Sequence, residues 1–184
     1  MGTTESKTVY FEKGGRENTD AALSIAKERA DALGIKDIIV ASYSGFTGAR
    51  AVEIFAGCSV TVVNGLQSDR MEPEYRRVIE EGNAKILSAG HAFGMLGRAV
   101  RNKFSTIQSD EIIAHVLRLF SQGVKVAAEI TCMATDAGII KPGTQVIAIG
   151  GSGQGADSAA VIKATNTQTF FDTRFLEILC KPRT

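Results

Sequence analysis

The sequence lacks the features that mark nucleic-acid-binding, membrane and secreted proteins. Its 21 lysines and arginines are balanced by 20 aspartates and glutamates. No basic stripe stands out, so nucleic acid is not an expected partner. No apolar run approaches the ~20 residues that a membrane span requires, and the N-terminus has no apolar segment of the signal-peptide kind. We therefore predict a cytoplasmic protein with no membrane partner.

Cysteine and histidine are also scarce. The three cysteines, Cys58, Cys132 and Cys180, are odd in number and far apart, which predicts buried, reduced thiols and no disulfide or metal site. The two histidines, His91 and His115, have no partner at metal-binding spacing, and no Ser–His–Asp set can be argued. The sequence assigns no catalytic residue and leaves open whether the protein is an enzyme.

The composition that remains is that of a single globular domain over residues 1–184. Hydrophobic residues make up 44% of the chain and charged residues 22%. Helical and strand patterns alternate along the chain, which predicts an α/β sandwich with a mostly parallel sheet. The helices are expected at about 18–33, 49–56, 74–81 and 109–122, and the strands at 36–41, 59–63, 84–87, 124–133, 146–149, 158–164 and 175–180.

Three segments of this assignment carry more specific expectations about helix or strand identity, burial and strand direction. The segment 124–133 is apolar enough for a strand, although Ala127–Ala128–Glu129 would also suit a helix. The helix over 109–122 is expected to bury one face, formed by Ile112, Ile113, Val116, Leu117 and Phe120. The strands on either side of the turn 150–155 should be antiparallel, so the sheet is predicted to be mixed.

The first candidate binding segment is the turn between the strand at 36–41 and the helix that follows it. It consists of Ser42, Tyr43, Ser44, Gly45, Phe46, Thr47 and Gly48. Backbone N–H groups and hydroxyls in such a turn converge at the positive end of a helix, where they can hold a phosphate. The alternative is a tight turn with Thr47 as a helix cap, and the sequence weighs the two about equally.

The second candidate segment is a glycine-rich turn formed by Gly150, Gly151, Gly153, Gly155, Ala156 and Asp157. It matches neither a dinucleotide fingerprint nor a Walker A loop. Either a ligand or another backbone must approach so many glycines closely, unless the turn is simply a flexible hairpin loop. Asp157 could bind a ligand hydroxyl or cap the turn.

The third candidate segment precedes the first helix and contains Arg16, Glu17 and Asn18. Arg16 could clamp a phosphate, but taken by itself the segment favours a capped helix start with a solvated charge pair. Glu129 lies in an apolar stretch, where an ionised carboxylate is costly unless it is paired. It is a candidate partner of Arg16 or a ligand-binding group, unless it faces solvent at an edge.

These segments carry a family resemblance. Residues 19–49 resemble the helix, strand and phosphate loop of the pyruvate kinase C-terminal domain, with Gly48 in place of that loop's final alanine. Nearly the whole chain is similar to a stand-alone, largely archaeal family with that fold, through the three segments above, Phe170–Phe171–Asp172 and the ending Cys180–Lys181–Pro182–Arg183. The resemblance implies a three-layer α/β/α sandwich with about five core strands, one of them antiparallel.

The resemblance also bears on function. It implies that relatives hold a flavin mononucleotide (FMN), so a phosphorylated small molecule, FMN first, is the expected ligand, with Tyr43 and Phe46 available to cover its ring. In sugar-phosphate-regulated pyruvate kinases the equivalent of the Ser42 loop holds an effector phosphate, so a sugar-phosphate sensor without catalysis is the alternative. Pyruvate kinase activity is not expected, since the catalytic barrel is not part of the resemblance. The sequence leaves self-association into a homo-oligomer open.

Overall fold

A mixed, seven-stranded sheet forms the middle layer of the structure, a computed structural model that describes residues 2–66 and 70–184. The strand order is β1-β7-β6-β5-β2-β3-β4. β6 is antiparallel to both of its neighbours and the other paired strands are parallel, as predicted. The strands are β1 (Val9–Phe11), β2 (Asp37–Ala41), β3 (Ser59–Val63), β4 (Lys85–Leu87), β5 (Gln145–Gly150), β6 (Ser158–Lys163) and β7 (Arg174–Pro182).

The sheet has more strands than the resemblance implied, because a short strand is added at each edge. β1 and β4 are three residues long and lie at the two ends of the strand order. β1 was not predicted, since a run of three residues is too short to show an alternating pattern. The five longer strands form the expected core of the sheet, and the two edge strands bring the total in the described residues to seven.

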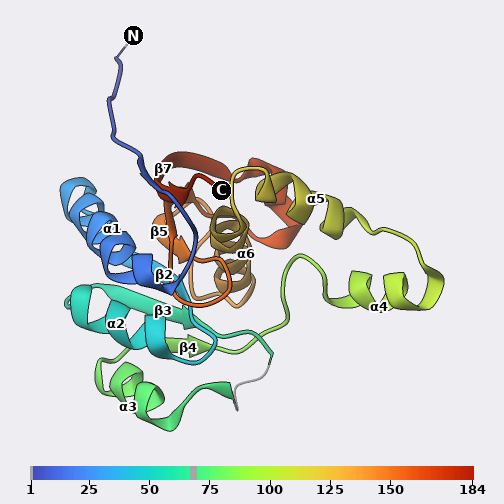
Figure 1. Ribbon diagram of the computed structural model, residues 1–184, viewed down its shortest axis with the longest axis horizontal. Coiled ribbons are helices and arrows are strands. Elements are labelled where there is room, and N and C mark those ends of the chain that lie inside the picture. Colours follow the sequence, from blue (N-terminus) through green and yellow to red (C-terminus); the bar gives the residue numbers. More distant parts are fainter. Residues whose placement is uncertain (1, 67–69) are drawn as a thin grey trace.

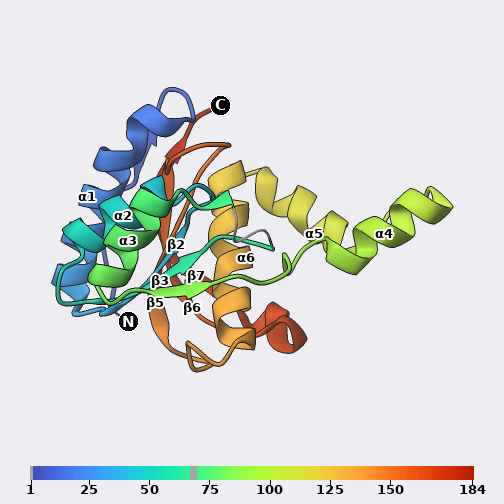
Figure 2. The same cartoon turned by 90° about the horizontal axis from the view of Figure 1, so that it is seen from below.

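Helices cover both faces of the sheet (Figures 1 and 2). One face carries α1 (Thr19–Leu33), α2 (Phe46–Ile54) and α3 (Pro73–Glu81), and the other carries α6 (Gln122–Asp136). Two further helices, α4 (Met95–Phe104) and α5 (Ser109–Arg118), extend away from α6 to one side. The three-layer α/β/α architecture predicted from the sequence is confirmed.

Two apolar cores lie on opposite faces of the sheet because successive strand residues point to opposite sides. In β2, Ile38 and Val40 belong to the core beneath α1 and α2, whereas Ile39 belongs to the core beneath α6. All three side chains are fully buried. The continuous apolar run of β2 is thus explained by coverage on both faces.

α6 corrects the prediction of a strand at 124–133. It is a 15-residue helix in which Ser121 accepts a hydrogen bond from the N–H of Val124 at 3.0 Å and so caps the N-terminus. The sheet covers one side of α6, and α5 and the 3₁₀ segment η3 (Thr167–Asp172) pack beside it. Because α6 is buried along nearly its whole length, apolar residues occur on most of its sides, and the apolar run at 124–133 is compatible with either a strand or a buried helix.

The expected buried face of α5 is also partly wrong. Ile113 and Leu117 pack against the protein, but Ile112 and Val116 are about half exposed, as is Phe120 beyond the end of the helix. The most deeply buried residues of α5 are Glu111 and Ala114. The spacing of the apolar residues correctly predicted a helix. It does not reveal which side of the helix packs against the rest of the protein, because apolar residues lie on more than one side.

Candidate functional site

A cleft of about 410 Å³ opens at the carboxyl ends of the parallel strands. The chain passes from β2 outward to β3 and β4, then returns to place β5 on the other side of β2. Loops on either side of such a reversal diverge to opposite faces of the sheet and leave a crevice, which is where open α/β sheets bind ligands. The cleft therefore lies where the topology alone would place a site.

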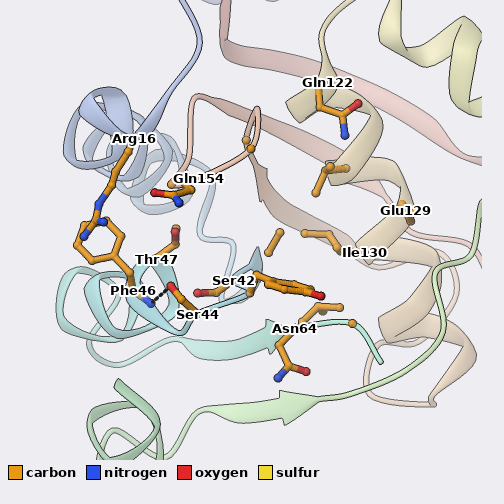
Figure 3. Close-up of a pocket in the computed structure, with 18 of the residues that line it drawn as sticks. Arg16, Ser42, Ser44, Phe46, Thr47, Asn64, Gln122, Glu129, Ile130 and Gln154 are labelled. Carbon is orange, nitrogen blue, oxygen red and sulfur yellow. Dashed lines mark hydrogen bonds between the residues drawn. The ribbon is translucent and has the colours of Figure 1, made fainter. Parts of the chain in front are cut away.

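The cleft brings together residues from all three predicted segments and Glu129. Figure 3 shows Ser42, Thr47 and Gln154 on one side and Gln122, Glu129 and Ile130 on α6 opposite them. The predicted site residues that line the cleft are Arg16, Ser42, Tyr43, Ser44, Phe46, Thr47, Glu129, Gly151, Gly153 and Gly155. Residues of all three segments therefore lie beside one another, although the sequence alone did not require the third segment to join the other two.

The first segment directs the N-terminus of α2 into the cleft. α2 begins at Phe46, earlier than the expected start at Ala49, and Gly45 precedes it with a φ of 100° that favours glycine. Thr47 lies in the first turn of α2, and Gly45 occupies the N-cap position. The alternative in which Thr47 caps the helix is therefore wrong. Ser42 Oγ accepts the N–H of Gly48 at 3.0 Å, and Ser44 Oγ lies 3.5 Å from the N–H of Phe46. Two serine hydroxyls and the positive end of a helix thus meet at one corner of the cleft.

Arg16 lies at the rim of this corner. Its guanidinium carbon stands 3.8 Å from the centroid of the Phe46 ring, a stacked cation–π geometry. The Phe46 ring also contacts Tyr75 edge to face, with ring centroids 6.0 Å apart. Arg16 and Tyr75 therefore both pack against the Phe46 ring. Tyr43 is about half exposed, and the Arg70 guanidinium lies 5.2 Å from its ring. Of the two rings expected to cover a ligand, Tyr43 is the more exposed.

The second segment is held against the start of α1 by its own backbone. An added Cβ at Gly151 would lie 2.2 Å from the carbonyl oxygen of Gly155, and one at Gly150 would lie 2.4 Å from that of Gly123. The Ala156 N–H donates to Thr19 Oγ1 at 3.1 Å, which ties this turn to the helix. Of the three readings left open by the sequence, close approach of protein backbone accounts for Gly150 and Gly151, whereas an added Cβ at Gly153 would meet open space.

Asp157 is a structural brace within the same turn. It is fully buried, and its Oδ2 accepts the N–H groups of Gly15 at 3.1 Å and Ser152 at 2.9 Å. Its Oδ1 accepts the Ser158 hydroxyl at 2.9 Å. The carboxylate is outside the cleft lining and is fully engaged, which corrects the idea that it binds a ligand hydroxyl. It holds the 14–15 loop against the second segment instead.

Gly153 and Gly155 offer a matched test of this arrangement. Both have positive φ, 92° and 74°, but an added Cβ at Gly153 meets open space, whereas one at Gly155 would lie 2.6 Å from the Arg16 Cα. We expect Gly155→Ala to lower the free energy of unfolding by about 1–3 kcal/mol more than Gly153→Ala, because overpacking adds to the shared backbone strain. Urea denaturation of both variants measures the difference. Equal losses would mean that the two segments are not in contact.

Several predicted site residues lie outside the cleft lining for identifiable reasons. Gly48 allows α2 to approach the sheet, since an added Cβ would lie 2.8 Å from Val62. Asn18 is the residue at the N-cap of α1, but its amide donates to the carbonyl of Lys13 at 2.8 Å and its side chain makes no capping hydrogen bond. The Glu17 carboxylate lies against Gly15. The predicted residues absent from the lining are Glu17, Asn18, Gly45, Gly48, Gly150, Ala156 and Asp157.

The wall opposite the α2 corner holds a buried charged cluster. Glu129 on α6 is 2% exposed, and its carboxylate accepts Lys125 Nζ at 2.5 Å and the N–H of Phe93 at 3.1 Å. His91 Nδ1 lies 3.3 Å from Glu129 Oε2, and because an ionised carboxylate can only accept, this nitrogen carries the hydrogen. Glu129 is therefore paired as its burial requires, but with Lys125 and His91 instead of Arg16.

These contacts decide the charge state of the cluster. Burial alone would raise the pKa of Glu129, but the hydrogen bond from His91 and the charge of Lys125 outweigh it and hold that pKa below its usual value. Burial lowers the pKa of Lys125, against the opposing effect of Glu129. Three hydrogen-bond donors meet the Glu129 carboxylate: Lys125, His91 and the N–H of Phe93. These donors stabilise the ionised form of Glu129 relative to its protonated form.

Sequence reasoning missed several cleft residues. His91 was set aside for want of a nearby partner in the sequence, yet it reaches Glu129 across a separation of 38 residues. An added Cβ at Gly65 would lie 3.3 Å from His91 Nε2, which places this nitrogen over the loop after β3 at the edge of the cleft. Asn64, Gln122 and Gln154 add amide groups, and Val126, Ile130 and Met133 of α6 supply an apolar wall. Gln154 lies within the second predicted segment, but no local motif signals the other residues.

The three cysteines lie apart from the cleft lining. Cys132 and Cys180 are buried, as predicted, and burial raises the pKa of each to about 12, whereas Cys58 is partly exposed. In residues 2–66 and 70–184 all three cysteines are free, and no cluster of three metal-ligating side chains occurs. Within the same residues, every helix is too short or too polar to cross a bilayer.

Comparison with known families gives one match. The family model described as pyruvate kinase, alpha/beta domain, matches residues 20–163, which is most of the chain. The matched region includes the Ser42 loop, α6 with Glu129, and the second glycine-rich segment. It contains nearly all of the residues that line the cleft; Arg16 precedes it.

Proposed function

Since the chain belongs to the pyruvate kinase alpha/beta domain family, we propose that it binds a phosphorylated small molecule in the cleft between α2 and α6, with FMN as the first candidate. The observation that carries the proposal is the corner where the N-terminus of α2 opens into the cleft beside Ser44 and Thr47. A helix N-terminus supplies N–H donors and a positive dipole end, which together favour phosphate.

The phosphate corner has donors of several kinds. The hydroxyl hydrogens of Ser42, Ser44 and Thr47 are free to turn toward an anion, because the recorded hydrogen bonds of the two serines use their oxygens as acceptors. Arg16 at the rim adds a positive charge, and Gln154 adds an amide. A phosphate placed here would be held by these hydroxyl, amide and guanidinium donors and by the positive end of α2, without a lysine.

The remainder of the cleft suits a flat, partly apolar group. A volume of about 410 Å³ lies within the 300–1,000 Å³ range of small-molecule sites. Val126, Ile130 and Met133 form an apolar wall on α6, while His91 and Asn64 supply polar groups near the loop after β3. A flavin ring has an apolar edge and a polar edge, so these residues fit it. The residues that would hold FMN are thus the α2 corner at the phosphate and α6 with His91 at the ring.

A sugar-phosphate sensor is the second candidate. Three amide side chains, those of Asn64, Gln122 and Gln154, line the cleft, and amides pair well with sugar hydroxyls. The phosphate would occupy the same corner in both cases. The two proposals differ only in what lies against the wall of α6.

Titration calorimetry with FMN, riboflavin and a hexose bisphosphate tests the proposal. We expect FMN to bind about 10- to 100-fold more tightly than riboflavin, the effect of one or more hydrogen bonds to a charged group. Equal affinity of FMN and riboflavin would place the phosphate outside the α2 corner. Binding of the hexose bisphosphate alone would favour the sensor, and binding of none of the three would overturn both proposals.

A further inference from the structure

α4 projects from the body of the protein with little to support it. None of its ten residues is buried, and Figures 1 and 2 both show it at the far end of the molecule from α1. It meets α5 through an ion pair between Arg101 and Glu111 at 2.7 Å and through Asp110, which lies against Gly97. A helix of this length is marginal in water unless an apolar face is covered.

The arm, defined here as residues 95–120, exposes an unusual amount of apolar surface. Leu96 is 79% exposed, Phe104 70% and Leu119 83%. Leu96, Val100 and Phe104 follow one another at four-residue spacing on α4, and Ile112, Val116 and Phe120 do so along α5 and just beyond it. Each stripe lies along one side of its helix. Apolar patches of this extent mark sites of association.

We propose that the arm packs against the arm of a second copy of this chain in a two-fold symmetric dimer. Seven apolar side chains of the arm are about half exposed or more: Leu96, Phe104, Ile107, Ile112, Val116, Leu119 and Phe120. At roughly 100 Å² each they supply about 700 Å², close to the ~800 Å² that each partner contributes to a stable interface. The inference does not depend on the identity of the cleft ligand.

The charges of the arm favour a second copy over a membrane. Arg98 and Lys103 are exposed on α4 and Asp110 is partly exposed in the first turn of α5, whereas Arg101 and the buried Glu111 already pair within the arm. A two-fold interface pairs the patch with itself, which allows Arg98 or Lys103 of one arm to approach Asp110 of the other. The chain as a whole carries a formal charge of +1, so repulsion between copies is small.

Light scattering after size-exclusion chromatography of the full chain tests the dimer. We expect the wild-type protein to show twice the 19.6 kDa chain mass, and Leu96→Glu/Phe104→Glu to weaken association by about 100-fold or more, since charges would be buried against apolar surface. Phe171→Glu is the matched control, because Phe171 is 82% exposed but lies outside the arm, and it should remain dimeric. Circular dichroism melting shows that each variant is folded.

Three results would overturn the inference. One is a wild-type protein that stays monomeric across micromolar concentrations, and another is a folded Leu96→Glu/Phe104→Glu variant that dimerises as the wild type does. The third is a monomeric wild-type protein that sediments with vesicles containing phosphatidylserine, which would make a lipid surface the occupant of the arm.

Discussion

Thr47→Glu is expected to abolish measurable binding of FMN. Thr47 is 3% exposed and lies in the first turn of α2, where the proposed phosphate would sit. A carboxylate at this position would satisfy the helix N-terminus itself and would repel the phosphate at short range. Thr47→Ala removes only one hydroxyl and should cost about 1–3 kcal/mol of binding free energy, the scale of a hydrogen bond to a charged group. Titration calorimetry measures both effects.

The control for this prediction is Thr47→Gln, which has the size of glutamate without its charge. If the loss arises from charge, Thr47→Gln should bind more tightly than Thr47→Glu, and all three variants should keep the thermal stability of a folded protein. Wild-type affinity in Thr47→Glu would mean that the phosphate of the ligand does not lie at the N-terminus of α2. An equal loss in the glutamine and glutamate variants would point to a steric effect.

Glu129→Ala should lower the free energy of unfolding by about 3–5 kcal/mol. The substitution leaves the Lys125 ammonium, which is 6% exposed, without its acidic partner. It also removes the acceptor of the Phe93 N–H. Removing one member of a buried ion pair costs this much because the other charge stays desolvated. Urea denaturation followed by circular dichroism measures the loss. A loss below about 1 kcal/mol would show that water or another group replaces the carboxylate.

The double variant Lys125→Met/Glu129→Leu is the matched control. It removes both charges and keeps most of the buried volume, so it should recover much of the stability lost in Glu129→Ala. The pKa of Glu129 is depressed in the folded protein, so its contribution to stability is present above the unfolded value of about 4.3 and is lost as the pH falls through the folded pKa. The double variant should therefore lose less stability than the wild type as the pH falls below about 4.

Some parts of the cleft could be predicted from the sequence and others could not. The Ser42–Gly48 turn was found because strand, turn and helix are contiguous and leave a local signature. The pairing of Glu129 with His91 could not be found, since the two residues are 38 positions apart and come together only through packing of α6 on the sheet. The glycines at 150, 151 and 155 were recognised as sites of close approach, but only the structure shows that a backbone approaches them.

The sequence by itself determined the α/β class, the mixed sheet and the strand–turn–helix arrangement around Ser42–Gly48, because local periodicity and turn chemistry depend on neighbouring residues. The tertiary structure decided that residues 124–133 form a helix and that Asp157 is a brace. It also decided that the apolar stripes of residues 95–120 face outward. The physical reason is common to all three: burial depends on which distant segment covers a residue, and an apolar run is compatible with a strand, a buried helix or an uncovered surface until that partner is in place.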